Sequence, residues 1–257
     1  MGSKRRKFLV VALAALAVLA IGSSAEAIRL RAGNIIIVAE GGFTPKKLPR
    51  HENAPITIHG GGKISTVNGE LPPILETIDI EFDRHGAVDT VGLPVCREGQ
   101  LEATTVTQAR KTCAGSIVGE GRGSAIVKFP EQAPIPASSP ITIFNGPKKH
   151  GNPTVLAHAY LTNPVVTTFI VPIEIEKIHK GVYGYRTHGV IPKIANGAGI
   201  PIEGELTIGK KWAYKGQIHS YISARCETGR LQARGQFKFK DGTFLAGTFL
   251  RPCQVRE

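Results

Sequence analysis

The sequence predicts a mainly β protein, an antiparallel β-sandwich with one short helix near residues 101–113. Three observations predict this class. Short runs rich in β-branched and aromatic residues recur along the chain and are separated by Gly, Pro, Asn and Asp. Residues 77–83 (TIDIEFD) alternate between apolar and polar side chains, as a strand with one wet face does. Asp241-Gly242 stands between two such runs and is typical of a two-residue hairpin turn.

The strand pattern is expected to continue along nearly the whole chain. Strands are predicted at residues 34–40, 54–59, 74–82, 116–129, 141–144, 154–162, 165–175, 181–194, 200–208, 218–226, 230–239 and 243–250. The last three are expected to form a meander, and the chain must then curl after Leu250 for Cys253 to reach Cys226. Residues 131–153 contain two predicted linkers rich in Pro, Gly and Asn. A single domain is expected over residues 28–257, with residues 131–153 as the one place where it could divide.

The segment before Cys113 departs from the strand pattern and predicts the helix. Thr105 and Gln108 have the spacing of a capping box. Arg110 and Lys111 follow where the C-terminus of a helix favours cations. Because isolated helices of this length are marginal in water, a disulfide from Cys113 would stabilise it against the preceding strand.

The N-terminus predicts export. Basic residues 4–7 precede an apolar run at 8–21 and the triplet Ala25-Glu26-Ala27, so residues 1–27 form a predicted signal peptide that is cleaved after Ala27. An apolar run of about 14 residues is short of the roughly 20 that span a bilayer, so no transmembrane anchor is expected after cleavage. The mature chain is expected to be secreted, either extracellular or associated with the cell envelope. Cleavage lowers the formal charge from +12 to +9, which still favours anionic partners.

The four cysteines, Cys96, Cys113, Cys226 and Cys253, all follow the predicted cleavage site. An even number of cysteines in an exported chain predicts disulfides, and four cysteines allow three pairings. Cys96–Cys113 and Cys226–Cys253 are favoured because each pair joins the two ends of a compact motif. The spacings do not match a zinc knuckle, so no metal and no cofactor is expected.

The run 119–123 (GEGRG) has the composition of a phosphate-binding loop but not its context. Ser124 follows without the lysine of a Walker loop, and the strand pattern continues where a dinucleotide fold requires a helix. The glycines are therefore expected to permit a bulge or a close backbone approach. A second motif that resembles a functional site is the carboxylate row Asp79, Glu81 and Asp83. It is expected to be a solvated strand face rather than a calcium site or a glycosidase pair.

Two groups of residues are candidate binding sites. No catalytic residue is predicted, because the sequence contains neither a GxSxG nor an HExxH motif. The first group gathers histidines and tyrosines that could contact a polar ligand: His158, Tyr160, His179, Tyr183, Tyr185 and His188. The second interleaves cations with aromatic rings, which suits an anionic glycan: Lys210, Lys211, Trp212, Tyr214 and Lys215.

Four segments carry a resemblance to known sequences: residues 93–96 (LPVC), 129–146 (FPEQAPIPASSPITIFNG), 178–199 (IHKGVYGYRTHGVIPKIANGAG) and 224–243 (ARCETGRLQARGQFKFKDGT). Through them most of the mature region resembles a group of uncharacterised exported bacterial proteins of actinobacterial type. The resemblance implies export, four cysteines and a β-rich fold. It implies no activity, cofactor or catalytic residue.

These observations predict a secreted, non-enzymatic protein with a binding or structural role at the cell envelope. Its expected partner is an anionic envelope polymer or glycan, with no specific nucleic acid. The alternative is a secreted hydrolase or lyase that acts on an anionic polysaccharide, with the histidine and tyrosine group as its site. The sequence carries no indication of the oligomeric state.

Overall fold

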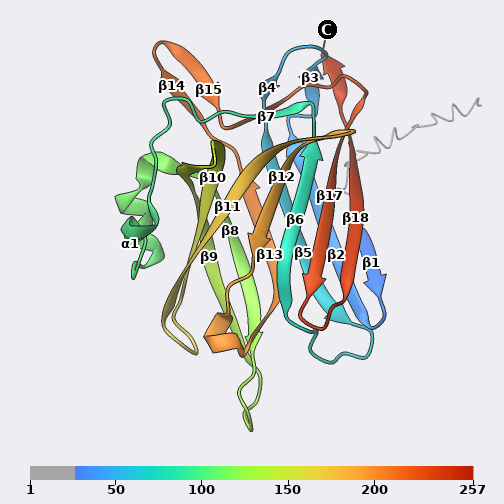
Figure 1. Cartoon of the computed structure of the whole chain (residues 1–257), viewed down its shortest axis with the longest axis vertical. Helices are drawn as coiled ribbons and strands as arrows, with labels where there is room; N and C mark the ends of the chain where they lie inside the picture. The colour runs from blue at the N-terminus through green and yellow to red at the C-terminus, as the bar shows by residue number, and fades with distance from the viewer. Residues whose placement is uncertain (1–26, 257) are drawn as a thin grey trace, which may run out of the picture.

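The computed structural model describes residues 27–256, so the predicted signal peptide lies outside the described residues apart from Ala27. The described chain forms one large antiparallel sheet, three small sheets and one short α-helix (Figure 1). In their order across the large sheet, the strands are β1 (Ile28–Ala32), β2 (Ile35–Thr44), β5 (Thr57–Thr66), β13 (Gly199–Ile208), β8 (Ile117–Val127), β9 (Ile135–Lys149), β10 (Asn152–Leu161), β11 (Thr167–Lys180), β12 (Tyr183–Val190), β6 (Leu75–Asp83), β17 (Arg230–Phe239) and β18 (Phe244–Pro252).

The small sheets lie beside the large one. They are the hairpin of β14 (Lys211–Tyr214) with β15 (Gln217–Ser220), the sheet of β4 (Ala54–Pro55), β16 (Ile222–Ala224) and β7 (Gly86–Val88), and the parallel pair of β3 (Lys47–Pro49) with β19 (Gln254–Arg256). Short 3-10 helices cover Glu98–Gln100, Ala114–Ser116 and Ile194–Gly197. The prediction of a mainly β, antiparallel protein is thus confirmed.

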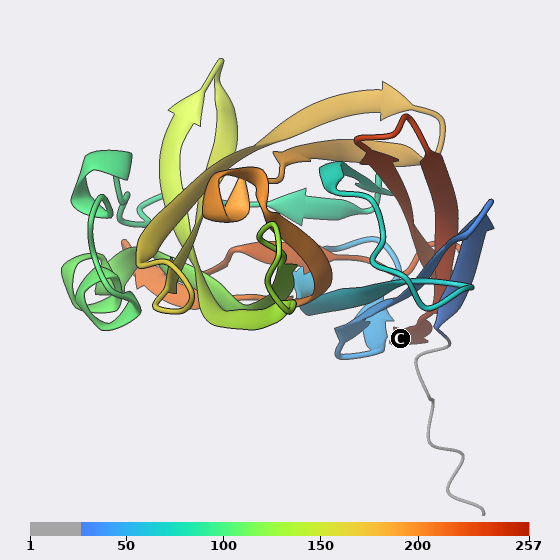
Figure 2. The same ribbon diagram turned by 90° about the horizontal axis from the view of Figure 1, so that it is seen from below.

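The large sheet is near-closed and barrel-like, and the predicted two-sheet sandwich is not what forms. Figure 2 shows the sheet curling round until β1 lies beside β18. A Cβ added to Gly247 on β18 would lie 2.6 Å from Leu30 Cδ2 and 2.7 Å from Ile28 Cδ1 on β1. The two edges therefore meet through side-chain packing. Alternation of apolar and polar residues is the same in a sandwich and in a curled sheet, which is why the pattern alone did not distinguish them.

The glycine-rich run 119–123 lies inside β8, as a strand. Gly121 is paired with Leu206 on β13 and with Ile141 on β9, and both of these side chains pack in the hydrophobic core. A Cβ on Gly121 would overlap the backbone carbonyl oxygen of Glu205 and lie 2.8 Å from Leu206 Cδ2. The predicted close backbone approach is therefore confirmed, and the glycine supplies curvature rather than a phosphate cradle.

The core is divided into clusters along the inner face of the sheet. One cluster lies towards the β1–β18 seam, one beside the disulfide Cys226–Cys253, and one between the β8–β9 and β11 walls. Their buried members include Ile37, Phe239 and Leu245 in the first, Phe43, Leu48 and Leu231 in the second, and Val118, Ile143, Ile175 and Tyr221 in the third. Burial raises the pKa of the Tyr221 hydroxyl well above its usual range.

The helix α1 (Val106–Thr112) begins later than residue 101 but has the predicted cap. Gln108 N donates to Thr105 Oγ1 at 3.3 Å, and Thr105 N donates to Gln108 Oε1 at 2.8 Å. The preceding residues form turns that bring Leu101 into the core against Phe144. The helix unit thus covers the outer face of β9 and β10, on the left of Figure 1.

Both predicted disulfides form. Cys96 is bonded to Cys113 with the two Cα atoms 5.6 Å apart, and Cys226 to Cys253 with 5.9 Å. Two disulfides indicate an oxidising setting. Every helix in the described chain is too short to cross a bilayer.

The predicted C-terminal meander is wrong. Residues 218–226 contribute to β15 and β16 in small sheets and do not join β17. Strand β18 stays in its ladder as far as Pro252, which is paired with Arg230. Cys226 and Cys253 therefore flank the ends of two adjacent strands, and no curl after Leu250 is needed to join them.

The predicted linkers within residues 131–153 are also wrong for most of their length, because β9 runs from Ile135 to Lys149. Of its three internal prolines, Pro147 lies where the register with β10 shifts, and the other two, Pro136 and Pro140, precede Ile141, where pairing with β10 ends. That side of β9 is an edge there, so a residue without an N–H is tolerated.

Substitution of Gly121 by Ala tests the close approach of β8 to β13. The added Cβ would overlap the backbone of Glu205, which cannot move without breaking the ladder, so Gly121→Ala should lower the free energy of unfolding by at least about 2 kcal/mol in urea. Gly204→Ala is the matched control, because its Cβ meets only Arg122 O at 3.9 Å and should change stability by less than about 0.5 kcal/mol. Equal stability of the two variants would contradict the curvature argument.

Candidate functional site

The acidic row on β6 shares one face, as predicted, but it is not a solvated face. Only Asp79 is half-exposed, whereas Glu81 is 1% exposed and Asp83 is 9% exposed. The cover comes from neighbouring strands, because Lys180 Nζ lies 3.1 Å from Glu81 Oε1 and Arg234 Nη1 lies 3.9 Å from Glu81 Oε2. Long cationic side chains thus lie over the carboxylate, which the sequence of β6 alone could not indicate.

Charged residues continue from this row onto β12 and β11. His188 is paired with Asp79 on one side and with Glu174 on the other. One row further along, Arg186 stands between Glu81 and Glu176. Acidic and basic residues therefore alternate from strand to strand, an arrangement that stabilises neighbouring strands by cross-strand attraction.

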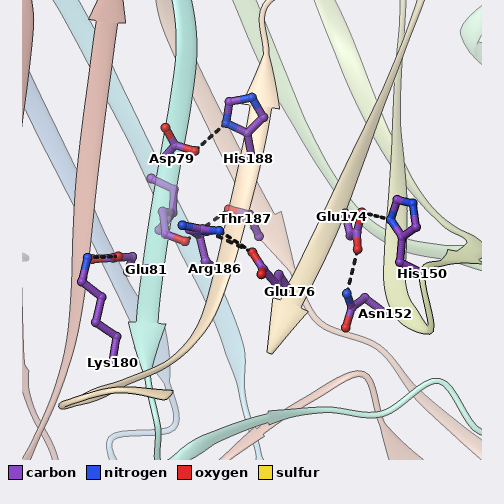
Figure 3. Close-up of polar contacts among 11 residues, drawn as sticks. Asp79, Glu81, His150, Asn152, Glu174, Glu176, Lys180, Arg186, Thr187 and His188 are labelled. Carbon is purple, nitrogen blue, oxygen red and sulfur yellow. Dashed lines mark hydrogen bonds and ion pairs between the residues drawn. The ribbon is translucent and has the colours of Figure 1, made fainter. Parts of the chain in front are cut away.

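This face is hollowed into a pocket of about 540 Å³, which we call the charged pocket. Its walls come from β6, β11, β12 and the β9–β10 hairpin (Figure 3). The lining residues are Asp79, His150, Asn152, Glu174, Glu176, Arg186 and His188.

Two histidine–carboxylate pairs lie in the charged pocket. His188 Nδ1 is 2.6 Å from Asp79 Oδ1, and His150 Nδ1 is 3.2 Å from Glu174 Oε2. Asn152 Nδ2 donates to the other oxygen of Glu174 at 2.7 Å. This hydrogen bond, with a smaller contribution from His150, holds the pKa of Glu174 below its usual range. Glu174 is therefore a carboxylate at neutral pH.

The remaining wall of the pocket is an ion pair. Arg186 Nη2 donates to Glu176 Oε2 at 2.6 Å, and Arg186 Nε donates to the same oxygen at 3.1 Å. The hydrogen bond to Glu176 raises the pKa of the guanidinium further. The second oxygen of Glu176 remains available to a ligand.

A different site lies where the disulfide Cys226–Cys253 closes one end of the sheet. Seven cationic residues gather there, and we call them the basic end: Lys46, Lys47, Arg50, Arg225, Arg230, Arg251 and Arg256. Backbone hydrogen bonds hold their segments together, from Cys226 N to Pro49 O at 2.8 Å and from Gln254 N to Lys46 O at 2.9 Å. In Figure 1 this is the end at which β3 and the C-terminus lie.

Most of the exposed cations of the basic end have no ion-pair partner among residues 27–256. Arg225 pairs with Glu227 at 3.2 Å. Within residues 27–256, no ion pair is formed by the other exposed cations of this group, Lys47, Arg50, Arg230 and Arg256. Burial, and then the charge of Arg251, lower the pKa of Lys46. Like charges are thus held close to one another by the fold.

The first sequence-predicted group does not form one site. His188 lies in the charged pocket, whereas Tyr185 packs in the core on the opposite face of β12. His158 is 0% exposed beneath the α1 unit, 3.1 Å from Thr104 Oγ1, and burial lowers its pKa. The other three members lie elsewhere: Tyr160 is partly buried on β10, His179 is exposed at the end of β11, and Tyr183 is partly buried at the start of β12.

The second predicted group lies on and before the β14–β15 hairpin, and its aromatic rings are engaged within the protein. Trp212 stacks on His219 with ring centroids 5.5 Å apart and donates from Nε1 to Val91 O at 3.0 Å. A Cβ on Gly92 would overlap the Tyr214 ring. Of the lysines, Lys210 donates to Gly115 O, while Lys211 and Lys215 are exposed. The group thus offers cations at the surface, without an open aromatic platform.

Sequence reasoning missed most of both sites. In the charged pocket it selected His188 but not the partners on β11 and the hairpin, which include Glu174 and Asn152. The available signal was the i,i+2 spacing of Glu174 with Glu176 and of Arg186 with His188, which places each pair on one strand face. Only the register of β11, β12 and β6 shows that these faces are the same one.

The chain matches no protein-family model, no curated protein and no solved structure. Across residues 27–256, no group of three or more His, Cys, Asp or Glu side chains is arranged to hold a metal ion.

Asn152→Ala tests the polarity of the charged pocket. It removes the main hydrogen bond to Glu174 and should raise the pKa of that carboxyl towards its usual range. A carboxyl whose pKa is lowered on folding stabilises the folded state above its unfolded pKa, and this contribution is lost as the pH falls through the folded pKa. The variant should therefore lose stability less steeply than the parent protein on acidification.

Carboxyl-carbon NMR titration measures the pKa, and urea unfolding at each pH measures the stability. Asn68→Ala is the control, because Asn68 makes a similar 2.7 Å bond to Glu70 in a different loop. An unchanged titration of Glu174 in Asn152→Ala would contradict the assignment.

Proposed function

We propose that the mature protein is a secreted, non-enzymatic binding protein of the cell envelope, and that its basic end contacts an anionic polymer or glycan. The proposal rests on seven cationic residues gathered at one end of the sheet, four of which, Lys47, Arg50, Arg230 and Arg256, are exposed and form no ion pair within residues 27–256. The formal charge of +9 after cleavage would assist the encounter.

Electrostatics explain why a polyanion suits this end. Lys46 and Arg251 are held near each other although both are cations, and the resulting repulsion contributes to the lowered pKa of Lys46. A polymer phosphate, sulfate or carboxylate beside them would offset the repulsion. The disulfide Cys226–Cys253 within the basic end keeps the cationic segments in place without a ligand, so little ordering is needed on binding.

The alternative function, a secreted hydrolase or lyase of an anionic polysaccharide, would use the charged pocket. Its support is the pair His188–Asp79, in which the carboxylate orients the imidazole as in many general bases. The binding function is preferred because the pocket itself is lined by three carboxylates, which repel an anionic substrate.

The binding function predicts a localised loss of affinity. The triple variant Lys47→Gln, Arg50→Gln and Arg256→Gln removes three exposed cations from the basic end and should weaken binding to polygalacturonate about tenfold or more. Affinity is measured by fluorescence anisotropy at several salt concentrations, and it should fall as salt rises.

The matched control removes the same charge from the opposite end of the sheet with Lys128→Gln, Lys193→Gln and Lys238→Gln. It should bind almost as the parent protein does, and neutral dextran should not bind at all. Equal losses in the two triple variants would refute a localised site. Release of new chain ends from polygalacturonate would instead establish the hydrolase or lyase.

A further inference from the structure

The charged pocket presents more acceptors than donors to a ligand, and its donors all belong to Arg186. Carboxylates only accept hydrogen bonds, so Asp79 and Glu174 fix the proton of a neutral imidazole on Nδ1 of His188 and His150. Nε2 of each ring is then a bare lone pair. Asn152 is oriented in the same way, because its amide nitrogen must face Glu174 and its oxygen is left over.

Apart from N–H groups of Arg186, the pocket atoms that make no hydrogen bond within residues 27–256 are acceptors. They are Asp79 Oδ2, Glu176 Oε1, Asn152 Oδ1 and the Nε2 atoms of His150 and His188. Arg186 is the one cation among the lining residues; its Nε and Nη2 both donate to Glu176, and the N–H groups of Nη1 are the donors that it retains. Three carboxylates against one guanidinium and the nearby charge of Lys149, which acts on Glu174, leave the pocket negative when the imidazoles are neutral.

We infer that the charged pocket binds a ligand through a primary ammonium group, such as that of an alkyl diamine or of a lysine-like side chain. An ammonium carries three donors and no acceptor, which complements a cluster of acceptors with surplus negative charge. The volume of about 540 Å³ accommodates a small polar molecule or one side chain. This site is independent of the basic end, which has the opposite charge.

Other ligand chemistries fit less well. An anion would meet three carboxylates, and a sugar hydroxyl would satisfy the acceptors without neutralising the surplus charge. A metal ion would require three or more ligands in a suitable arrangement, and residues 27–256 contain no such group. An ammonium group donates hydrogen bonds to the acceptors of the pocket and also neutralises part of its negative charge.

Calorimetry with 1,5-diaminopentane at about pH 8, above the usual titration range of histidine, tests the inference on the mature protein. Binding should shift the imidazole Nε2 resonances of His150 and His188, and pentane-1,5-diol, which has the same length and no charge, should not bind. Asp79→Asn and Glu176→Gln should each weaken the affinity about tenfold. Glu203→Gln, an exposed carboxylate on β13, is the matched control and should leave it unchanged.

A second titration distinguishes a free diamine from a peptide side chain. It uses lysine amide that is acetylated on the α-amino group and keeps its ε-ammonium group. Tighter binding of this compound than of the diamine assigns the site to a peptide side chain, and the reverse assigns it to a free diamine. Failure of both compounds to bind, equal binding of the diol, or an equal loss in Glu203→Gln would overturn the inference. Because none of these variants alters the basic end, polygalacturonate binding should persist in all of them, which separates this result from the proposed function.

Discussion

The close approach of β8 to β13 at Gly121 is the constraint on which the rest of the structure depends. No side chain fits there, because the Glu205 carbonyl occupies the space. Four residues lie opposite one another across β8, β13, β5 and β2: Gly121, Leu206, Gly60 and Gly41. Only one of the four, the leucine, has a large side chain. A row with so little volume on its inner side lets the sheet bend sharply, and only a sharply bent sheet of this width brings β1 to β18.

Closure of the sheet also creates the basic end. Pairing of β1 with β2 ends at Ala39, so β2 continues to Thr44 without that neighbour. Arg251 on β18 donates from Nε to Gly41 O across this gap. At this point β2 and β18 are therefore joined by a cationic side chain and not by backbone hydrogen bonds between strands. Lys46 follows two residues after the end of β2 and comes under the influence of the same guanidinium. The proximity of Lys46 to Arg251 is therefore a consequence of how the sheet is closed.

Local features could be predicted from the sequence, and features set by pairing between distant strands could not. The Thr105 cap and the strand alternation depend on neighbours in the chain and were found correctly. The hairpin at Asp241-Gly242 was placed correctly, but its turn is longer than two residues, because it includes Lys240 and is closed by the bond from Phe239 N to Thr243 O. The burial of Glu81 depends on Lys180, which is 99 residues away, and could not be inferred from β6. The same applies to the charged pocket: each strand shows an ordinary polar face, and the site exists only because β11, β12 and β6 are adjacent in one register.

The two rows of the charged face differ in a way that explains where a ligand could act. In the row of Glu176, Arg186, Glu81 and Arg234, acids and fixed cations alternate in equal numbers, so the charges satisfy one another. In the row of Glu174, His188 and Asp79, two carboxylates flank an imidazole that has no fixed charge. The surplus negative charge therefore lies in the second row, although the chain as a whole is cationic. Net charge describes how the protein meets a polymer at a distance, whereas the order of residues across the strands decides what each surface binds at contact.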